Sequence, residues 1–307
     1  MPQTPCVSVL LTSYNREAFV AEAIESVLAQ SFTDFELVVS DDHSSDRTVE
    51  IANAYANRDP RIRVSVNERN LGDYGNRRHV ASLARGRFLK YHDSDDVMYR
   101  HCLSTMVELL EAEPSAAFAL SGSGSWPGGP CPMLLTPSLA YERECLGRGL
   151  FHQGPASALF RTDAFRALGG FPEIAYAGDY LFWIRACASV NVLLVPGDLF
   201  YYRVHEGQEI AKPDSVAAYA RAAGEMWRML NSSSCPISGD DLELAKRNFV
   251  FSQGRSLYRR LKRGELGTVV SSLRLLGLGI GDWIQYLRPP RRRASAGTPD
   301  GLRSLSQ

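Results

Sequence analysis

The stretch VSVLLTSYNREAFVAEAIESVLAQSFTDFELVVSDD, residues 7–42, decides the fold. It begins with a short apolar run rich in β-branched residues, 7–11, which is typical of a buried strand. Apolar residues then recur at helical spacing through 16–30, and Asn15 is the predicted N-cap of this helix. A second apolar run, 35–40, completes a strand–helix–strand unit. A helical crossover of this length predicts that the two strands are parallel.

The same alternation continues along the chain. Further strands are predicted, with helical patterns between most of them, at 62–66, 87–91, 116–121, 157–161, 191–196 and 199–205. The sequence therefore predicts an α/β fold with a mainly parallel, Rossmann-like sheet flanked by helices.

The remaining segments differ in composition. Residues 122–150 are rich in Gly and Pro and are expected to form a long loop. We expect three parts: an α/β domain over 1–212, a helical C-terminal extension over 213–288, and a tail over 289–307 that lacks apolar periodicity and is expected to be disordered.

Charge is unevenly spread along this chain of 307 residues, although its net charge is zero. Residues 255–293 hold ten Lys and Arg against two acidic residues, a net charge of +8, and 1–254 carry −8. A basic segment of this kind predicts peripheral contact with an anionic membrane. A solvated helical hairpin or an oligomer interface is the alternative. Nucleic acid is not an expected partner, because no recognised nucleic-acid-binding module accompanies the charge.

The cysteines and the N-terminus bear on the compartment. Six scattered cysteines without a C-x-x-C pair fit a reducing cytosol better than a disulfide framework or a zinc site. The apolar run at 7–11 is too short for a signal peptide, and no apolar stretch reaches the length of a membrane span. We expect a cytoplasmic protein, in peripheral contact with the inner face of the plasma membrane if the basic segment binds lipid.

Polar residues gather where the predicted strands end. Thr12 to Asn15 follow the first strand, Asp41 and Asp42 the second, and the acidic stretch 93–96 follows the strand at 87–91. Each group alone could be an N-cap or a turn. In a parallel sheet the three groups converge on the edge where ligands bind, which favours a binding site.

The acidic stretch has the spacing Asp93-x-Asp95, which suits one divalent cation. Mg²⁺ and Mn²⁺ prefer oxygen ligands, and Mg²⁺ is commonly held by one or two carboxylates together with substrate phosphates. The sequence has neither a G-x-G-x-x-G after the first strand nor a Gly-Lys-Ser/Thr. The pattern therefore predicts a phosphorylated ligand held through Mg²⁺ or Mn²⁺ rather than by a glycine cradle.

These motifs resemble those of the inverting glycosyltransferases of family 2, which have the GT-A fold. The resemblance covers about residues 6–205. It rests on the stretch at 7–42 with its continuation HSSDRT, then on NLGDYGNRRHVASLARGRFLKYHDSDD, ALFRTDAFRALGGFPE, AGDYLFWIRA and YYRVH, in this order. Their combination and order are specific, whereas D-x-D alone is a weak signal.

The resemblance assigns roles on the nucleotide side. Thr12 and Tyr14 match contacts to the base and ribose, and Asp42 matches the carboxylate that accepts a hydrogen bond from the base, with Asp41 as its neighbour. Asn76 and Arg77 match a polar pair lining the nucleotide, with Arg77 facing the diphosphate. From the pattern alone, Arg77 and Arg78 could instead form a solvated helix face.

The resemblance also assigns the metal and the base. Asp93 and Asp95 match the D-x-D, with Asp95 the direct ligand, and His205 matches a position that approaches the metal or diphosphate. Asp179 matches the general base, although its place before a helix also fits an N-cap. The family often has Glu-Asp here, whereas this chain has Gly178-Asp179, so its acceptor contacts are expected to differ.

The implied activity is transfer of a sugar, with inversion, from a nucleoside diphosphate sugar, expected to be UDP-linked. The acceptor is the hydroxyl of a glycan or a lipid-linked molecule in cell-surface polysaccharide or glycolipid synthesis of a bacterial type. Trp126 is a candidate for stacking on the acceptor. A sugar-phosphate nucleotidyltransferase would need a Gly-rich loop where TSYNREA stands. A silent nucleotide-sugar-binding protein would lack Asp95 or Asp179, and both are present.

Overall fold

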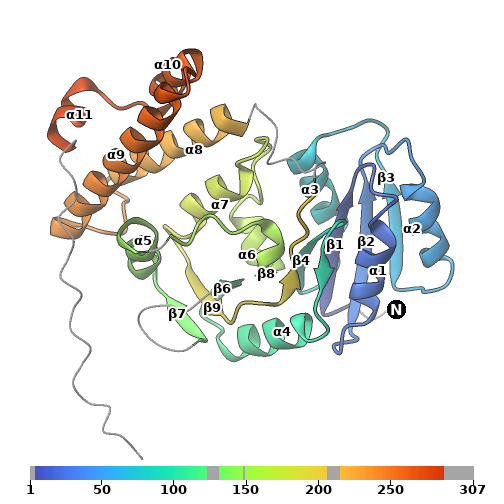
Figure 1. Cartoon of the computed structure of the whole chain (residues 1–307). Helices are drawn as coiled ribbons and strands as arrows, with labels where there is room; N and C mark the ends of the chain where they lie inside the picture. Colours follow the sequence, from blue (N-terminus) through green and yellow to red (C-terminus); the bar gives the residue numbers. More distant parts are fainter. Residues whose placement is uncertain (1–3, 123–130, 148, 206–214, 287–307) are drawn as a thin grey trace, which may run out of the picture.

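The structure is a computed structural model that describes residues 4–122, 131–147, 149–205 and 215–286. Eight strands form one sheet in the order β3-β2-β1-β4-β8-β6-β9-β7 (Figure 1). Their bounds are β1 Val7–Ser13, β2 Phe35–Asp41, β3 Ile62–Val66, β4 Phe88–Asp93, β6 Ala116–Ser121, β7 Met133–Leu135, β8 Ala158–Arg161 and β9 Asn191–Val195. β1 to β4 are parallel, as are β6 and β9, and β8 and β7 run antiparallel to their neighbours. The predicted mainly parallel sheet is confirmed.

The helices of the α/β domain cover both faces of the sheet. They are α1 Val20–Leu28, α2 Thr48–Ala56, α3 Asp73–Ser82, α4 Cys102–Ala112, α5 Pro137–Leu146, α6 Thr162–Ala167 and α7 Gly178–Ala186. Alternate residues of β1 face opposite ways, as the pleat of a strand requires. Val9 belongs to one core cluster together with residues of α1 and α4, and Leu10 belongs to the other, with residues of α3, α6 and α7.

Three local predictions need correction. Asn15 is not a helix N-cap: its φ is 51°, and α1 begins only at Val20. The expected loop over 122–150 contains β7 and α5, because Thr136 caps the helix by accepting from the Leu139 N–H and Pro137 fits its first turn. The predicted strand at 199–205 shortens to β10, Phe200–Tyr201, which pairs antiparallel with β5, Val97–Met98. Trp126 lies outside the described residues.

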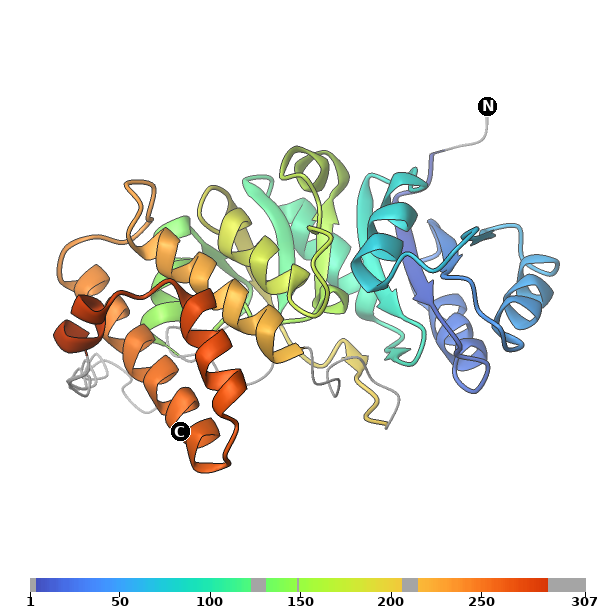
Figure 2. The same ribbon diagram turned by 90° about the horizontal axis from the view of Figure 1, so that it is seen from above.

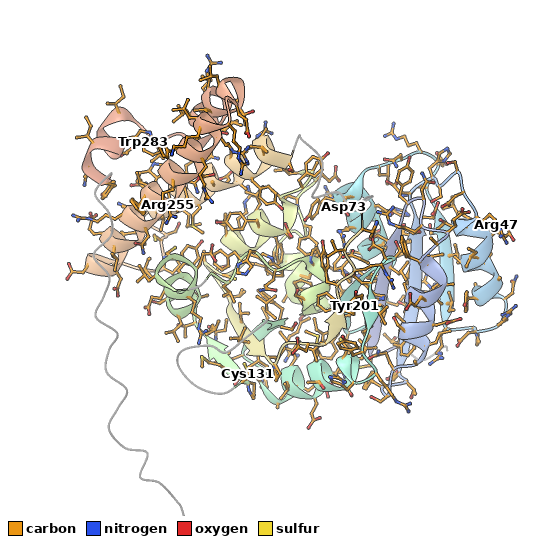
Figure 3. The ribbon with its side chains drawn as sticks, in the orientation of Figure 1. Arg47, Asp73, Cys131, Tyr201, Arg255 and Trp283 are labelled. Atoms are coloured by element: carbon orange, nitrogen blue, oxygen red, sulfur yellow. The ribbon has the colours of Figure 1, made fainter. Side chains whose placement is uncertain are left out.

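Residues 215–286 are mainly helical and pack on the α/β domain. They form α8 Ser215–Leu230, α9 Gly239–Lys262, α10 Leu266–Leu276 and α11 Ile280–Tyr286. Figure 2 shows these helices at the opposite end of the molecule from α2. Trp227, Val250 and Tyr286 are buried in the same core cluster as Trp183 of α7. Within the described part of the basic segment, 255–286, the buried residues Ser272, Leu276 and Tyr286 attach its helices to the folded body, and Figure 3 shows Arg255 and Trp283 on these helices.

Among the described residues, no helix has both the length and the apolar character needed to cross a membrane.

Candidate active site

The carboxyl ends of β1, β2 and β4 bring the predicted polar residues together. Thr12 is in register with Ser40 on one side and with Asp93 on the other, and Ser13 is in register with Asp41. The convergence expected from a parallel sheet is therefore present. Tyr14, just beyond β1, is 45% exposed, so its ring is available to a ligand at this edge.

Asp41 shapes the turn after β2. Its carboxylate is fully buried and accepts hydrogen bonds from the Ser13 hydroxyl at 3.1 Å, the Ser44 hydroxyl at 2.6 Å and the Ser44 N–H at 2.8 Å. Both carboxylate oxygens are used by the protein itself. The geometry therefore indicates that Asp41 stabilises the turn after β2.

Asp42 holds the segment that leads into α3. It accepts from the Asn67 side chain at 2.8 Å and from the backbone N–H groups of Leu71 at 2.8 Å and Gly72 at 2.9 Å. A carboxylate has about four lone-pair sites, so these three bonds leave room for one more donor. A contact from Asp42 to a nucleotide base stays a prediction.

Asn76 stabilises the segment around Asp42 through hydrogen bonds of its buried side chain. Only 2% of the residue is exposed. Its amide oxygen accepts from the Ser40 hydroxyl at 2.7 Å and from Asn67 at 3.0 Å, and its amide nitrogen donates to the Ser40 carbonyl at 2.9 Å. Asn76 thus holds the Asp42 region in place, and a direct contact to a ligand is not visible in this arrangement.

Arg77 is buried between two carboxylates, so the alternative of a solvated helix face is wrong for this residue. Its guanidinium donates to Asp73 at 2.8 Å and to Asp93 at 2.6 Å. The third nitrogen, Nη1, is buried and has no hydrogen-bond partner among the described residues. Arg78 does lie on the surface, where it pairs with Glu173. Arg77 is therefore a fixed cation at the strand edge with one donor group unused.

Asp95 is contacted by two cationic or potentially cationic side chains. Its Oδ2 accepts from Arg16 Nε at 3.1 Å and lies 2.9 Å from His205 Nε2. Arg16 and His205 come from segments far apart in the chain, and both reach the same oxygen. The Arg16 contact was missed at the level of sequence, where its only signal is a basic residue directly after TSYN.

The four-residue acidic stretch is not fully ionised. Asp96 is buried, its Oδ1 accepts from the Arg203 N–H at 3.0 Å, and Oδ2 has no partner among the described residues. Burial, reinforced by the charge of Asp93, raises the pKa of Asp96 to about 8. Burial acts in the same direction on Asp93, but the Arg77 guanidinium outweighs it and lowers the pKa of that carboxyl. Protonation of Asp96 and pairing of Asp93 and Asp95 with basic groups relieve the repulsion.

The residues fit a divalent cation held partly by a ligand. No group of three or more His, Cys, Asp or Glu with metal-binding geometry exists within the described parts of the chain. Two adjacent ligands of an octahedral ion at about 2.1 Å lie roughly 3.0 Å apart. Asp95 Oδ2 and His205 Nε2, 2.9 Å apart in a hydrogen bond, are close enough for both atoms to contact one such ion. Mg²⁺ typically takes its other ligands from water and phosphates.

Asp179 lies in the first turn of α7. Its Oδ1 accepts from the Tyr180 N–H at 2.7 Å, and its own N–H donates to the Tyr74 hydroxyl at 2.9 Å. Burial raises the pKa of Asp179 to about 6, against the lowering effects of the Tyr180 N–H and the Tyr74 hydroxyl. The carboxyl is thus at once a helix-end acceptor and a group that titrates near neutral pH.

Tyr74 also explains the glycine before Asp179. A Cβ at Gly178 would lie 2.6 Å from the Tyr74 ring and 2.8 Å from the Pro172 carbonyl oxygen. Tyr74 is buried, and its ring lies 5.9 Å from the Arg77 guanidinium carbon. Figure 3 marks Asp73 at the start of the same helix, α3. Tyr74 therefore occupies the space of a side chain at 178 and links the strand edge to Asp179.

The fold, with polar and acidic side chains at the carboxyl ends of β1, β2 and β4, is of the GT-A class. Residues 8–169, more than half of the chain, match the family described as "Glycosyl transferase family 2", and the chain belongs to this family. Asp179 and His205 lie beyond the matched residues.

Relatives among characterised and named proteins agree with this assignment. The chain is 28% identical over 295 residues to the poly(ribitol-phosphate) β-N-acetylglucosaminyltransferase TarS of Staphylococcus aureus, covering 91% of this chain and 49% of TarS. It is 36% identical over 118 residues to TuaG of Bacillus subtilis, a teichuronic acid biosynthesis glycosyltransferase by name, covering 38% of this chain and 46% of TuaG. The chain thus spans about half the length of these curated relatives.

Solved structures share the fold at low sequence identity. TarS 1–349 in complex with UDP-GlcNAc superposes with a TM-score of 0.68 at 22% identity, covering 92% of this chain and 82% of the other. The mannosyltransferase PcManGT from Pyrobaculum calidifontis, in complex with GDP-Man and Mn²⁺, gives 0.61 at 16% identity, with coverage of 92% and 79%. At these identities the likeness extends to the fold alone.

Proposed function

We propose that this protein transfers a sugar, with inversion, from a UDP-linked sugar to an acceptor hydroxyl in the synthesis of a cell-surface polysaccharide or glycolipid. The observation that carries the proposal is the arrangement at one sheet edge: the Asp95–His205 pair, the fixed Arg77, and a carboxyl with a pKa of about 6 at Asp179. Family membership supports it, as do the names of the relatives: TarS is a poly(ribitol-phosphate) β-N-acetylglucosaminyltransferase solved with UDP-GlcNAc, and TuaG is named for teichuronic acid biosynthesis.

The donor would lie across the ends of β1, β2 and β4. We assign the base and ribose to Thr12, Tyr14 and the free acceptor position of Asp42. The diphosphate would face Arg77, whose unused Nη1 is a hydrogen-bond donor in a buried setting. This donor geometry is supported by the positions of the side chains at the strand edge.

Mg²⁺ or Mn²⁺ would be held by Asp95 and His205, and Asp93 of the same D-x-D is proposed to contact it through water. Such an ion, when bound, supplies positive charge to the diphosphate leaving group. Arg16 donates to the same Asp95 oxygen, so it must move aside or shift its hydrogen bond when that oxygen takes a cation. Arg16 thus stabilises the carboxylate when no cation is present.

Asp179 is proposed as the general base. A base works best when its pKa lies near the working pH, and burial brings the pKa of this carboxyl to about 6. Tyr74 fixes the backbone at Asp179 through the 2.9 Å hydrogen bond. The acceptor hydroxyl would lose its proton to the Asp179 carboxylate as its oxygen attacks the sugar.

A panel of UDP- and GDP-sugars tests the proposal by thermal stabilisation of the protein with and without Mn²⁺. We expect one or more UDP-sugars to stabilise the protein in a Mn²⁺-dependent way, and Asp95→Asn to remove that dependence. The absence of stabilisation by every nucleotide sugar would refute the proposed function.

We also propose that the exposed face of α9 to α11 rests on an anionic membrane on the cytoplasmic side. Leu266, Ile280 and Ile284 are 62%, 80% and 73% exposed. Arg259 and Lys262 are exposed on α9 nearby in sequence. Apolar side chains next to basic ones suit the lipid interface. Residues 287–293, which carry four further arginines of the basic segment, lie outside the described residues.

A further inference from the structure

A cavity of about 470 Å³ lies between the α/β domain and the C-terminal helices that pack on it. Asp179 is on its wall, and α8, α9 and α10 supply most of the remainder. Its volume is within the usual range for small-molecule sites, roughly 300–1,000 Å³. Those helices lie beyond residue 169, where the family match ends, so these walls belong to the part of the chain outside the matched region.

The walls combine neutral hydrogen-bonding groups with aromatic and apolar surface. Gln253 and Ser256 of α9 offer an amide and a hydroxyl, and Tyr219 of α8 and Leu257 of α9 offer flat or apolar surface. Arg260 also lines the cavity, but its guanidinium is paired with Glu265 at 2.8 Å. This composition suits a molecule rich in hydroxyl groups better than a strongly anionic one.

The cavity is close to the proposed base. Asp179 lines it together with Tyr219, and after burial the charge of Asp179 is the largest cause that raises the pKa of Tyr219. A molecule in the cavity would therefore lie within reach of the Asp179 carboxylate. A second cavity, of about 550 Å³, is lined by Ala116 and Asn191, which lie at the starts of β6 and β9. This second cavity is therefore at the end of the sheet opposite to the edge where ligands bind.

We propose that the cavity at Asp179 is the acceptor site and that it holds a terminal sugar or polyol unit, with the helices α8 to α10 selecting that unit. The inference rests on the proposed transferase function. The acceptor oxygen would form the bond to the sugar carbon, its proton would pass to Asp179, and the nucleoside diphosphate would leave with the electron pair of the broken bond. Ser256 and Gln253 are then specificity-determining residues of the C-terminal extension.

Saturation-transfer NMR with p-nitrophenyl β-glucoside and with ribitol, at saturating UDP and Mg²⁺, tests the inference on the full chain. We expect at least one probe to bind, and Ser256→Phe to weaken it about tenfold or more by filling the cavity. The matched control is Ser252→Phe, one turn earlier on α9 and exposed, which should leave binding unchanged.

A second pair of variants, on α8, tests whether a loss of probe binding comes from filling the cavity or from misfolding. Ala220 lines the cavity on α8 and Ala217 of the same helix faces solvent, so Ala220→Trp should weaken probe binding and Ala217→Trp should not. UDP affinity, measured first for every variant, reports an intact donor side. Failure of UDP to bind the unmodified protein would count against the proposed function. UDP binding without binding of either probe, or equal probe binding in both members of each pair, would overturn the acceptor-site inference alone.

Discussion

Replacing Asp179 by Asn should remove most turnover and at the same time stabilise the fold. General base catalysis contributes about 10²- to 10⁴-fold, which is about 3 to 5 kcal/mol of barrier. Donor affinity should stay close to that of the unmodified protein, because the Asp179 side chain is proposed to act on the acceptor. Turnover is measured as release of UDP from the donor that the panel selects.

The expected gain in stability follows from the pKa of Asp179. Folding raises this pKa from 3.8 to about 6. Since the folded state binds the proton more tightly, the ionised carboxyl disfavours folding above the folded pKa and has no such effect below pH 3.8. The gap of about 2 units corresponds to at most about 3 kcal/mol. Urea unfolding should therefore show Asp179→Asn to be the more stable protein at pH 8, with the difference fading toward pH 4.

The pH dependence of turnover checks the same reasoning in the unmodified protein. A general base acts when deprotonated, so the rate should rise with pH through about 6 and then level off. At pH 5 roughly a tenth of Asp179 is ionised, and turnover should be about tenfold below the plateau.

Asp163→Asn is the matched control for Asp179→Asn. Asp163 lies in the first turn of α6 and accepts from the next N–H, that of Ala164, at 2.8 Å, just as Asp179 accepts from Tyr180 at 2.7 Å. Asp163 is exposed and lines the second cavity, at the end of the sheet opposite to the site, so its replacement should change neither turnover nor the pH profile. Near-normal turnover in Asp179→Asn, with stability at pH 8 unchanged or reduced, would mean that Asp179 is only a helix cap.

Three further outcomes are expected. Asp95→Asn should abolish transfer and remove the Mn²⁺ dependence of UDP binding in a calorimetric titration; equal UDP affinity with and without Mn²⁺ in the unmodified protein would rule out a metal-bridged site. Tyr74→Phe should move the acidic limb of the pH–rate profile upward, because the Tyr74 hydroxyl lowers the pKa of Asp179, whereas an unmoved limb would restrict Tyr74 to packing. The protein should sediment with anionic vesicles, release in high salt and ignore neutral vesicles; replacing Arg259 and Lys262 together by Gln should weaken this binding by about 2 kcal/mol, roughly 30-fold, and absence of vesicle binding at low salt would refute the membrane contact.

Much of the fold is present in the local sequence pattern. The strands at 62–66 and 116–121 have the bounds that hydrophobic periodicity predicts, because burial of one face imposes a period that the sequence must carry. The convergence of Thr12, Asp41 and Asp93 also follows from the sequence, since parallel strands end at one edge. The sequence analysis did not predict β7 and α5. Both lie in a Gly- and Pro-rich segment, and this composition obscures the apolar periodicity of a strand or helix.

Only the tertiary structure decides what each polar side chain contacts. Asp42 and Asn76 both appear as site residues in the sequence, yet long-range contacts make Asn76 a buried brace and leave Asp42 one acceptor position. Arg16 meets Asp95 across a separation of 79 residues, which no local pattern encodes. The pKa of Asp179 is likewise a property of burial in the assembled fold.

The basic C-terminal segment shows the same division. Its charge and helical period are readable along the chain, and they predict helices with an affinity for anionic surfaces. That α8 packs beside α7, that α9 and α10 pack on α8, and that these helices enclose a cavity at Asp179 depends on contacts between elements separated by tens of residues. Periodicity specifies which face of a helix is buried, whereas the partner of that face is chosen by packing of the whole chain.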